Sequence, residues 1–111
     1  MDRVEHIRGL IRGILQEFAS YKPTYGDVDV EVVADDTAGH YELWHIGWNR
    51  WERIHACILH IDFKGDKIWI QHDGTEDGIA SDLMEAGISP QEIVLAFHPP
   101  SERRLTPFAV S

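Results

Sequence analysis

The residues best suited to chemistry in this sequence are histidines and carboxylates gathered in its middle third. They are His60, Asp62, His72, Asp73, Glu76 and Asp77. Imidazoles and carboxylates that converge can bind a divalent cation or transfer protons. The same pattern also suits a structural role, because Asp73 and Glu76 have the spacing of a capping box and acidic side chains favour a helix N-terminus. The sequence favours capping and leaves a metal or catalytic site as the alternative.

The other reactive residue types give weaker signals. His45 and His55 fall inside predicted strands, where a hydrogen-bonded, half-buried histidine is the common case. Cys57 is predicted to lie buried in a strand and to be inert. No Ser-His-Asp, Cys-His, P-loop or G-x-G-x-x-G pattern occurs at a recognisable spacing. The residue chemistry alone therefore names no enzyme and no cofactor.

Hydrophobic periodicity predicts an α+β fold that begins with a helix. Apolar residues spaced three and four apart predict a helix from about Asp2 to Tyr21, ended by Lys22-Pro23. From Asp27 the period changes to two, which predicts an antiparallel four-stranded meander. Its strands run from Asp27 to the turn at 35–39, and over about 40–48, 51–63 and 68–72. A two-residue turn at Asn49-Arg50 would place Trp48 opposite Trp51.

Helical periodicity returns after Gly74. The segment carries Ile79, Ala80, Leu83 and Met84 on one side, is capped by Asp73 or Thr75, and ends at Gly87. A capping box with proline at the first helical position, Ser89-Pro90-Gln91-Glu92, predicts one further short turn. The segment 93–98 is either the rest of that helix or another strand, and the apolar tail 106–110 can pair with the sheet edge.

Both faces of the predicted sheet carry apolar side chains. The predicted turns place Trp44, Ile46, Arg53, His55, Cys57, Leu59, Ile61, Phe63, Ile68 and Ile70 on one face. The other face receives Tyr41, Leu43, His45, Ile54, Ala56, Ile58, His60, Asp62, Trp69 and Gln71. His72 points away from His60 in this register. A sheet with one solvated face alternates more cleanly.

We therefore expect helices to cover one face of the sheet and a second chain to cover at least part of the other. The alternative is that the C-terminal segments cover the second face within one molecule. The expected partner surface comprises Tyr41, Leu43, Trp44, Trp48, Trp51, Trp69 and Gln71.

Length and charge limit the remaining options. The 111 residues, 43% hydrophobic and 26% charged, suit a single domain over 1–111. The charged N-terminus excludes a signal peptide, no apolar run is long enough to span a membrane, and one cysteine excludes an internal disulfide, so we expect a soluble, cytoplasmic protein. The net charge of −9 and the scarcity of basic clusters disfavour direct DNA binding, for which Arg3, Arg8 and Arg12 are the best candidates. The acidic stretches 27–42 and 66–95 suit a basic protein partner better.

An ordered series of motifs resembles the XisI family over nearly the whole chain. It comprises Tyr41-Glu42-Leu43, Gly47-Trp48, the segment 53–57, His60-Ile61-Asp62, and the segments 66–80, 85–88, 93–98 and 106–110. XisI proteins are named as controlling factors for excision of the fdxN element, a developmentally regulated, site-specific DNA rearrangement. A different protein is the recombinase.

The resemblance implies a non-enzymatic, regulatory protein with an XisI-like fold, acting by protein–protein binding with a companion XisH-like protein that is nuclease-like in fold. It assigns no catalytic residues and no cofactor. A homo-oligomer such as a dimer is a second way to cover the sheet. The rival hypothesis is a small metal-dependent hydrolase that uses His60, Asp62, His72, Asp73 and Glu76.

Overall fold

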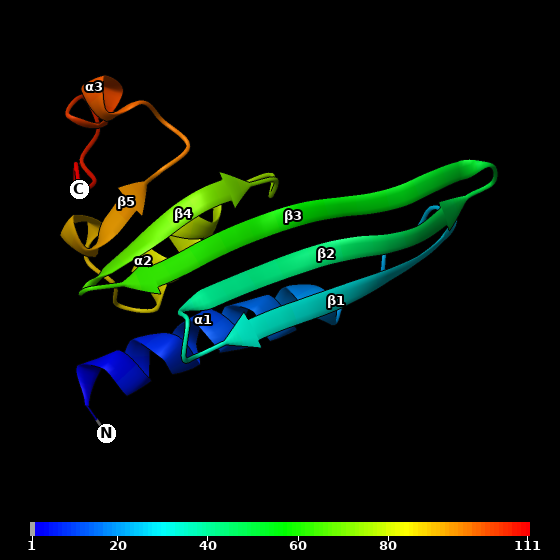
Figure 1. The fold of residues 1–111 in the computed structure, drawn as a ribbon, viewed down its shortest axis with the longest axis horizontal. Helices are drawn as coiled ribbons and strands as arrows, with labels where there is room; N and C mark the ends of the chain where they lie inside the picture. Colours follow the sequence, from blue (N-terminus) through cyan, green and yellow to red (C-terminus); the bar gives the residue numbers. More distant parts are fainter. Residues whose placement is uncertain (1) are drawn as a thin grey trace.

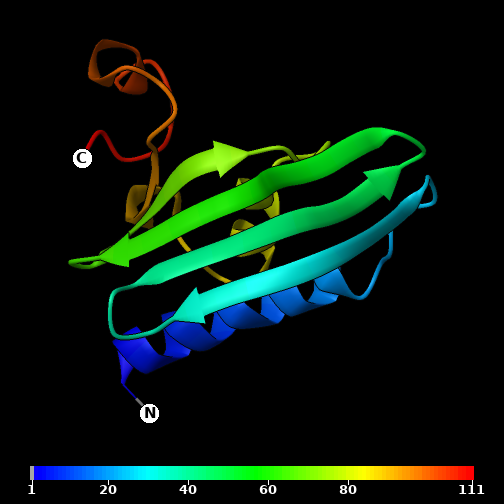
Figure 2. The same cartoon turned by 45° about the vertical axis from the view of Figure 1, so that its right-hand side comes forward.

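A five-stranded sheet carries its two longer helices on the same face (Figures 1 and 2). The computed structural model describes residues 2–111. The elements in chain order are α1 (Arg3–Ala19), β1 (Asp27–Asp35), β2 (His40–Asn49), β3 (Glu52–Lys64), β4 (Lys67–Asp73), α2 (Ile79–Glu85), a 3₁₀ turn η1 (Pro90–Glu92), β5 (Ile93–Leu95) and α3 (Pro100–Arg103). The α+β class is as predicted.

Helix α1 follows the predicted apolar spacing. Asp2 caps it, because its side chain accepts a hydrogen bond of 2.8 Å from the backbone N–H of Glu5. Ile7, Ile11 and Leu15 recur every four residues and are buried against the sheet. The predicted helix over Asp2–Tyr21 is confirmed with slightly tighter limits.

The sheet has one more strand than the predicted meander. Strands β1 to β4 form the antiparallel meander, and β5 then pairs with β4 in parallel after the crossover through α2. For the segment 93–98, whose type the sequence leaves open, the structure has a strand over Ile93–Leu95 followed by a turn at 96–98. The tail also reaches the sheet, because Ala109 forms a bridge to Val94.

The hairpin between β2 and β3 turns one residue later than predicted. Asn49 pairs with Glu52, and Arg50 adopts the left-handed conformation with φ 57°. Trp48 therefore lies opposite Arg53, whose guanidinium is 5.3 Å from the tryptophan ring. The expected pairing of Trp48 with Trp51 is wrong, and Trp51 is 90% exposed in the turn.

A β-bulge between β2 and β3 changes the predicted division of the sheet into two faces. The pairing of β2 with β3 shifts between Leu43 and Trp44, and the extra residue on β3 is Ile58. Beyond this bulge Tyr41 faces Ile61 and Leu43 faces Leu59, so Tyr41 and Leu43 join the buried layer beneath the helices. The expected position of these two side chains on the opposite face is wrong, because one inserted residue reverses the side-chain alternation.

The buried residues of β4 and α2 and the cap of η1 agree with the predictions from the sequence. Ile68, Ile70, Ile79 and Leu83 are fully buried in the same layer as the α1 side chains. The capping box of η1 is present, with Ser89 and Glu92 each accepting a backbone hydrogen bond.

The loop between β4 and α2 depends on one side chain. Asp73 Oδ1 accepts hydrogen bonds from the backbone N–H and the hydroxyl of Thr75, and Asp73 Oδ2 accepts one of 2.8 Å from the backbone N–H of Ile79. Asp73 therefore accepts from the first amide of α2, in agreement with a structural role, but the predicted capping box of Asp73 with Glu76 is wrong, because α2 begins at Ile79 with Gly78 as its N-cap.

Replacing this side chain should destabilise the fold. For Asp73→Ala we expect a loss of about 1–2 kcal/mol in the free energy of unfolding, because two donors of Thr75 and the first amide of α2 lose their acceptor. Urea denaturation measures it, with Asp77→Ala as the matched control, since Asp77 lies exposed in the same loop. Equal stability of the two variants would contradict the capping role.

Candidate functional site

The sheet face opposite α1 and α2 carries neither of the two longer helices, and the C-terminal segment with α3 reaches it only near Trp69 (Figures 1 and 2). We call this the open face and define it by the side chains that alternate with the buried layer. They are His40, Glu42, Trp44, Ile46 and Trp48 of β2, Arg53, His55, Cys57, His60 and Asp62 of β3, and Trp69 and Gln71 of β4. The open face thus combines aromatic groups with a set of histidines.

The apolar part of the open face is a shallow hollow across β1, β2 and β3. Its volume is about 260 Å³, and its lining includes Val33, Trp44, Ile46 and His55. The Trp44 ring lies 5.0 Å from the His55 ring, and its Nε1 donates a hydrogen bond of 3.0 Å to Glu42. Trp44 is therefore fixed in place while part of its ring stays accessible.

The polar part of the open face is a hydrogen-bonded cluster centred on Asp62. Asp62 Oδ1 lies 2.6 Å from His40 Nδ1 and 2.9 Å from His60 Nε2. Its second oxygen accepts a hydrogen bond of 3.1 Å from the amide of Gln71. Asp62 is only 8% exposed, so these partners replace the water that a carboxylate needs.

The electrostatics of the cluster follow from this geometry. The hydrogen bond and the charge of Asp62 raise the pKa of His40 above 6.5. Burial opposes ionisation of Asp62, but the hydrogen bonds from His40 and His60 outweigh it and lower the pKa of that carboxyl group. The cluster therefore holds a carboxylate ready to bind a cation or a hydrogen-bond donor.

The backbone brings these residues together at two points. Gly39 adopts φ 73° and passes so close to β3 that a Cβ atom there would lie 2.2 Å from the Phe63 carbonyl oxygen. This approach starts β2 with His40 opposite Asp62. Gln71 is the additional residue at the second bulge, which lies between the pairs His60–His72 and Ile61–Ile70. The bulge turns Gln71 toward Asp62.

Some of the residues that the sequence singled out for chemistry meet here and others do not. His60 and Asp62 are in contact and Gln71 donates to Asp62, as their predicted position on one face implies. The predicted pairing of His60 with Gln71, and the expectation that His72 points away from His60, are wrong, because the bulge at Gln71 places His72 opposite His60. His72 is exposed on β4, Asp73 caps α2, and Glu76 and Asp77 are exposed in the next loop.

Sequence reasoning missed His40 as a member of this cluster. Its partner Asp62 lies 22 positions further along the chain, and their contact depends on the bulge at Ile58. No local motif marks that bulge.

The residues expected on a partner surface also separate. Tyr41 and Leu43 are 0% and 2% exposed and belong to the core. Trp44 and Trp48 lie on the open face and Trp51 at the hairpin tip. These three tryptophans remain a predicted contact surface.

Trp69 and Gln71 lie at the other end of the open face. The Trp69 ring is flanked by Lys64 Nζ at 4.4 Å and by the guanidinium of Arg103 at 5.8 Å. Arg103 belongs to α3, so the C-terminal segment covers this part of the open face. Gln71 is engaged with Asp62.

A second hollow lies on the helix side of the sheet, at the C-terminal end of α1. It measures about 430 Å³ and is lined by Phe18, Tyr21 and His45 together with Glu76, Asp77 and Asp82. An adjoining hollow of about 400 Å³ between α1 and α2 adds Glu17 and Glu85. Neither lining includes lysine or arginine, so this region is strongly acidic.

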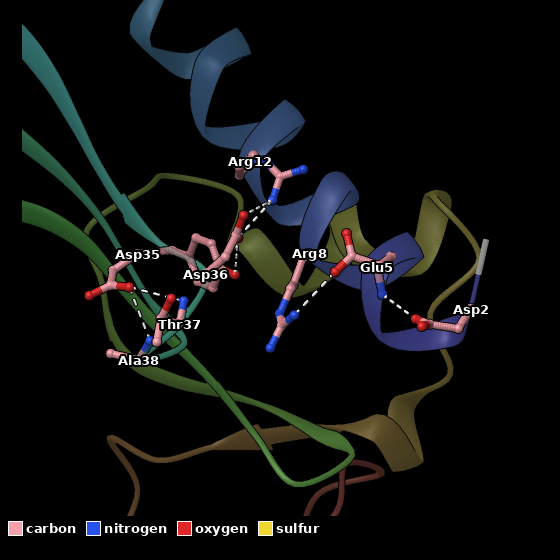
Figure 3. A network of polar contacts seen from close by, with 9 residues as sticks. Asp2, Glu5, Arg8, Arg12, Asp35, Asp36, Thr37 and Ala38 are labelled. Atoms are coloured by element: carbon pink, nitrogen blue, oxygen red, sulfur yellow. Dashed lines mark hydrogen bonds and ion pairs between the residues drawn. The ribbon is translucent and has the colours of Figure 1, made fainter.

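The arginines near the N-terminus are engaged in ion pairs (Figure 3). Arg12 contacts both oxygens of Asp36 at 2.7 and 2.6 Å, and Arg8 lies 3.2 Å from Glu5. Asp36 also accepts a hydrogen bond of 2.6 Å from the hydroxyl of Tyr41. Burial and this hydrogen bond raise the pKa of Tyr41 to about 12. Away from this network, Arg3 forms a two-fold contact with Glu92.

No helix within residues 2–111 is long and apolar enough to cross a membrane.

Comparisons with known proteins agree with one another. The family model for the XisI protein matches residues 1–110. A XisI-like protein from Anabaena variabilis ATCC 29413 is 30% identical with a TM-score of 0.91, covering 98% of this chain and 100% of that chain. The fdxN element excision controlling factor XisI from the same organism is 31% identical with a TM-score of 0.84, covering 99% and 100%. Curated proteins give no match.

The stability of the protein should depend on pH through the Asp62 cluster. Because the pKa of His40 is raised in the fold, its pairing with Asp62 stabilises the protein fully below pH about 6.5 and loses this effect as the pH rises through the raised value. The stability difference between wild type and His40→Ala should therefore shrink from pH 6 to pH 9, as measured by urea denaturation at each pH.

An NMR titration tests the same pair directly. In Asp62→Asn the pKa of His40 should return toward 6.5, with the His55 resonance as the internal control. An unchanged His40 titration would show that Asp62 does not control it.

Proposed function

The chain belongs to the XisI family, and we propose that it is a non-enzymatic accessory factor that controls excision of an fdxN-type DNA element by binding another protein. The family match and the relative described as an excision controlling factor support the role. The open face supports the mode of action.

The observation that carries the proposal is the one-sided placement of the helices. Trp44, Ile46 and Val33 surround a hollow on the face without helices, and Trp48 is 51% exposed beside them. Tryptophan is enriched at the centres of protein interfaces, where it contributes large buried area at low entropic cost. We assign this surface to the XisH-like companion.

An unpaired strand edge lies next to this surface. Strand β4 pairs with β3 only from Leu59 to Lys64, so the first part of β3, from Glu52, extends beyond it without a neighbour on that side among the described residues. An open edge of this kind is a template for a strand from another protein. A partner seated on Trp44 and Trp48 would reach both the ring surface and this edge.

Direct binding to DNA fits the charges poorly. Arg3, Arg8 and Arg12 each contact a carboxylate, so binding a phosphate would require breaking an existing ion pair. The net charge of −9 adds a general repulsion from the DNA backbone. Control through a protein partner avoids both costs.

The rival hydrolase hypothesis also loses support. It requires His60, Asp62, His72, Asp73 and Glu76 to form one site, whereas Asp73 is occupied by the backbone of the β4–α2 loop. Glu76 is exposed in that loop.

Charge placed in the hollow should weaken companion binding. With a tagged XisH-like protein, Trp44→Glu should reduce co-purification of this chain at least about tenfold, because a carboxylate would have to be buried in an apolar contact. Leu105→Glu is the matched control, since Leu105 is 73% exposed on the C-terminal segment. Thermal unfolding verifies that both variants are folded.

Two outcomes would overturn the proposal. Equal recovery of wild type and Trp44→Glu would remove the open face from the interface. A dimer of this chain that Trp44→Glu dissociates, with companion binding unchanged, would assign the open face to a second copy.

A further inference from the structure

We propose that His40, His60 and Asp62 form a binding site for a divalent transition-metal ion on the open face. The site is distinct from the companion surface at Trp44 and Trp48, and the inference does not rest on the proposed function.

The donor atoms already have the spacing of metal ligands. One imidazole nitrogen each of His40 and His60 and a carboxylate oxygen of Asp62 all lie within 4.8 Å of one another. Ligands about 2.1 Å from a common ion in tetrahedral or octahedral geometry are separated by roughly 3 to 3.5 Å. Asp62 Oδ1 is 2.6 and 2.9 Å from the two nitrogens, so shifts of less than about 1 Å admit an ion between them.

The ligands are held by rigid neighbours. His40 comes from β2 and the other two from β3, on strands paired directly at these positions. Gln71 fixes the second oxygen of Asp62 at 3.1 Å, which is the kind of outer contact that orients a ligating carboxylate. The side chain of Asp62 is 12% exposed, whereas those of His60 and His40 are 34% and 53% exposed. The carboxylate is thus anchored in the sheet, and solvent reaches the ion from the histidine side.

The donor set selects the class of ion. Two imidazole nitrogens and one carboxylate favour Zn²⁺, Fe²⁺, Co²⁺ or Ni²⁺, whereas Mg²⁺ and Ca²⁺ prefer sites made of oxygen ligands. Neutral imidazoles and one carboxylate bring a net charge of −1 to the ion. Three protein ligands leave at least one coordination position for water or for a group from another molecule.

The experiment uses Zn²⁺ and Co²⁺ as probes of the full chain after treatment with a chelator. Titration calorimetry at pH 7.5 should give one site per chain. His40→Ala and Asp62→Asn should each weaken Zn²⁺ binding at least about tenfold, and Gln71→Leu should weaken it about tenfold without changing the stoichiometry. His55→Ala is the matched control, because His55 lies on the same face outside the cluster, and its affinity should stay within about twofold of wild type.

Visible absorption of bound Co²⁺ provides a readout of the ligands themselves. Wild type and His55→Ala should develop ligand-field bands, and Asp62→Asn should not. Thermal unfolding in chelator separates loss of the site from loss of the fold. Zn²⁺ affinity that is the same in wild type, His40→Ala and Asp62→Asn, or that falls equally in His55→Ala, would overturn the proposal and assign binding to scattered surface histidines. Neither result bears on co-purification with the companion.

Discussion

The structure depends on a single apolar layer between the helices and one face of the sheet. Ile7 and Ile11 of α1 pack in one cluster with Tyr41, Ile61 and Ile70 of the strands, and all five are almost completely buried. Burial of this layer is the main favourable term in folding. Because both longer helices are used on one side, the other side of the sheet is left to be polar, to bind a partner, or to do both in different places.

Much of the scaffold could be predicted because its signals are local. The spacing in α1, the alternation in β1 and the capping box at Ser89 each act over a few residues and agree with the structure. Strand β5 cannot be identified from the sequence, because three residues from Ile93 carry too little pattern to distinguish a strand from a helix. Its pairing with β4 arises from the crossover through α2, which is a tertiary effect.

The candidate sites could be predicted in part from the sequence, for the same reason. The proximity of His60, Asp62 and Gln71 follows from a short hairpin, and the sequence sufficed to place them on one face. The contact of His40 with Asp62 and the burial of Tyr41 depend on a bulge. No turn residue in the sequence indicates where this bulge lies. Near the hairpin tip the predicted faces are correct although the register is shifted by two residues, and beyond the unpaired residue in β3 the predicted faces are incorrect.

That bulge has a consequence for how the chain can change in length. Removing Ile58 would join Cys57 directly to Leu59, and the existing pairs Trp44–Cys57 and Leu43–Leu59 would then form an uninterrupted ladder. Tyr41 and Leu43 would stay beneath the helices and His40 would stay opposite Asp62. A ladder that kept Ile58 and paired it with Leu43 would instead turn Leu59 and Ile61 to the open face and bring Asp62 beneath the helices. The bulge is therefore a position at which this strand pair can lose one residue without exchanging its two faces.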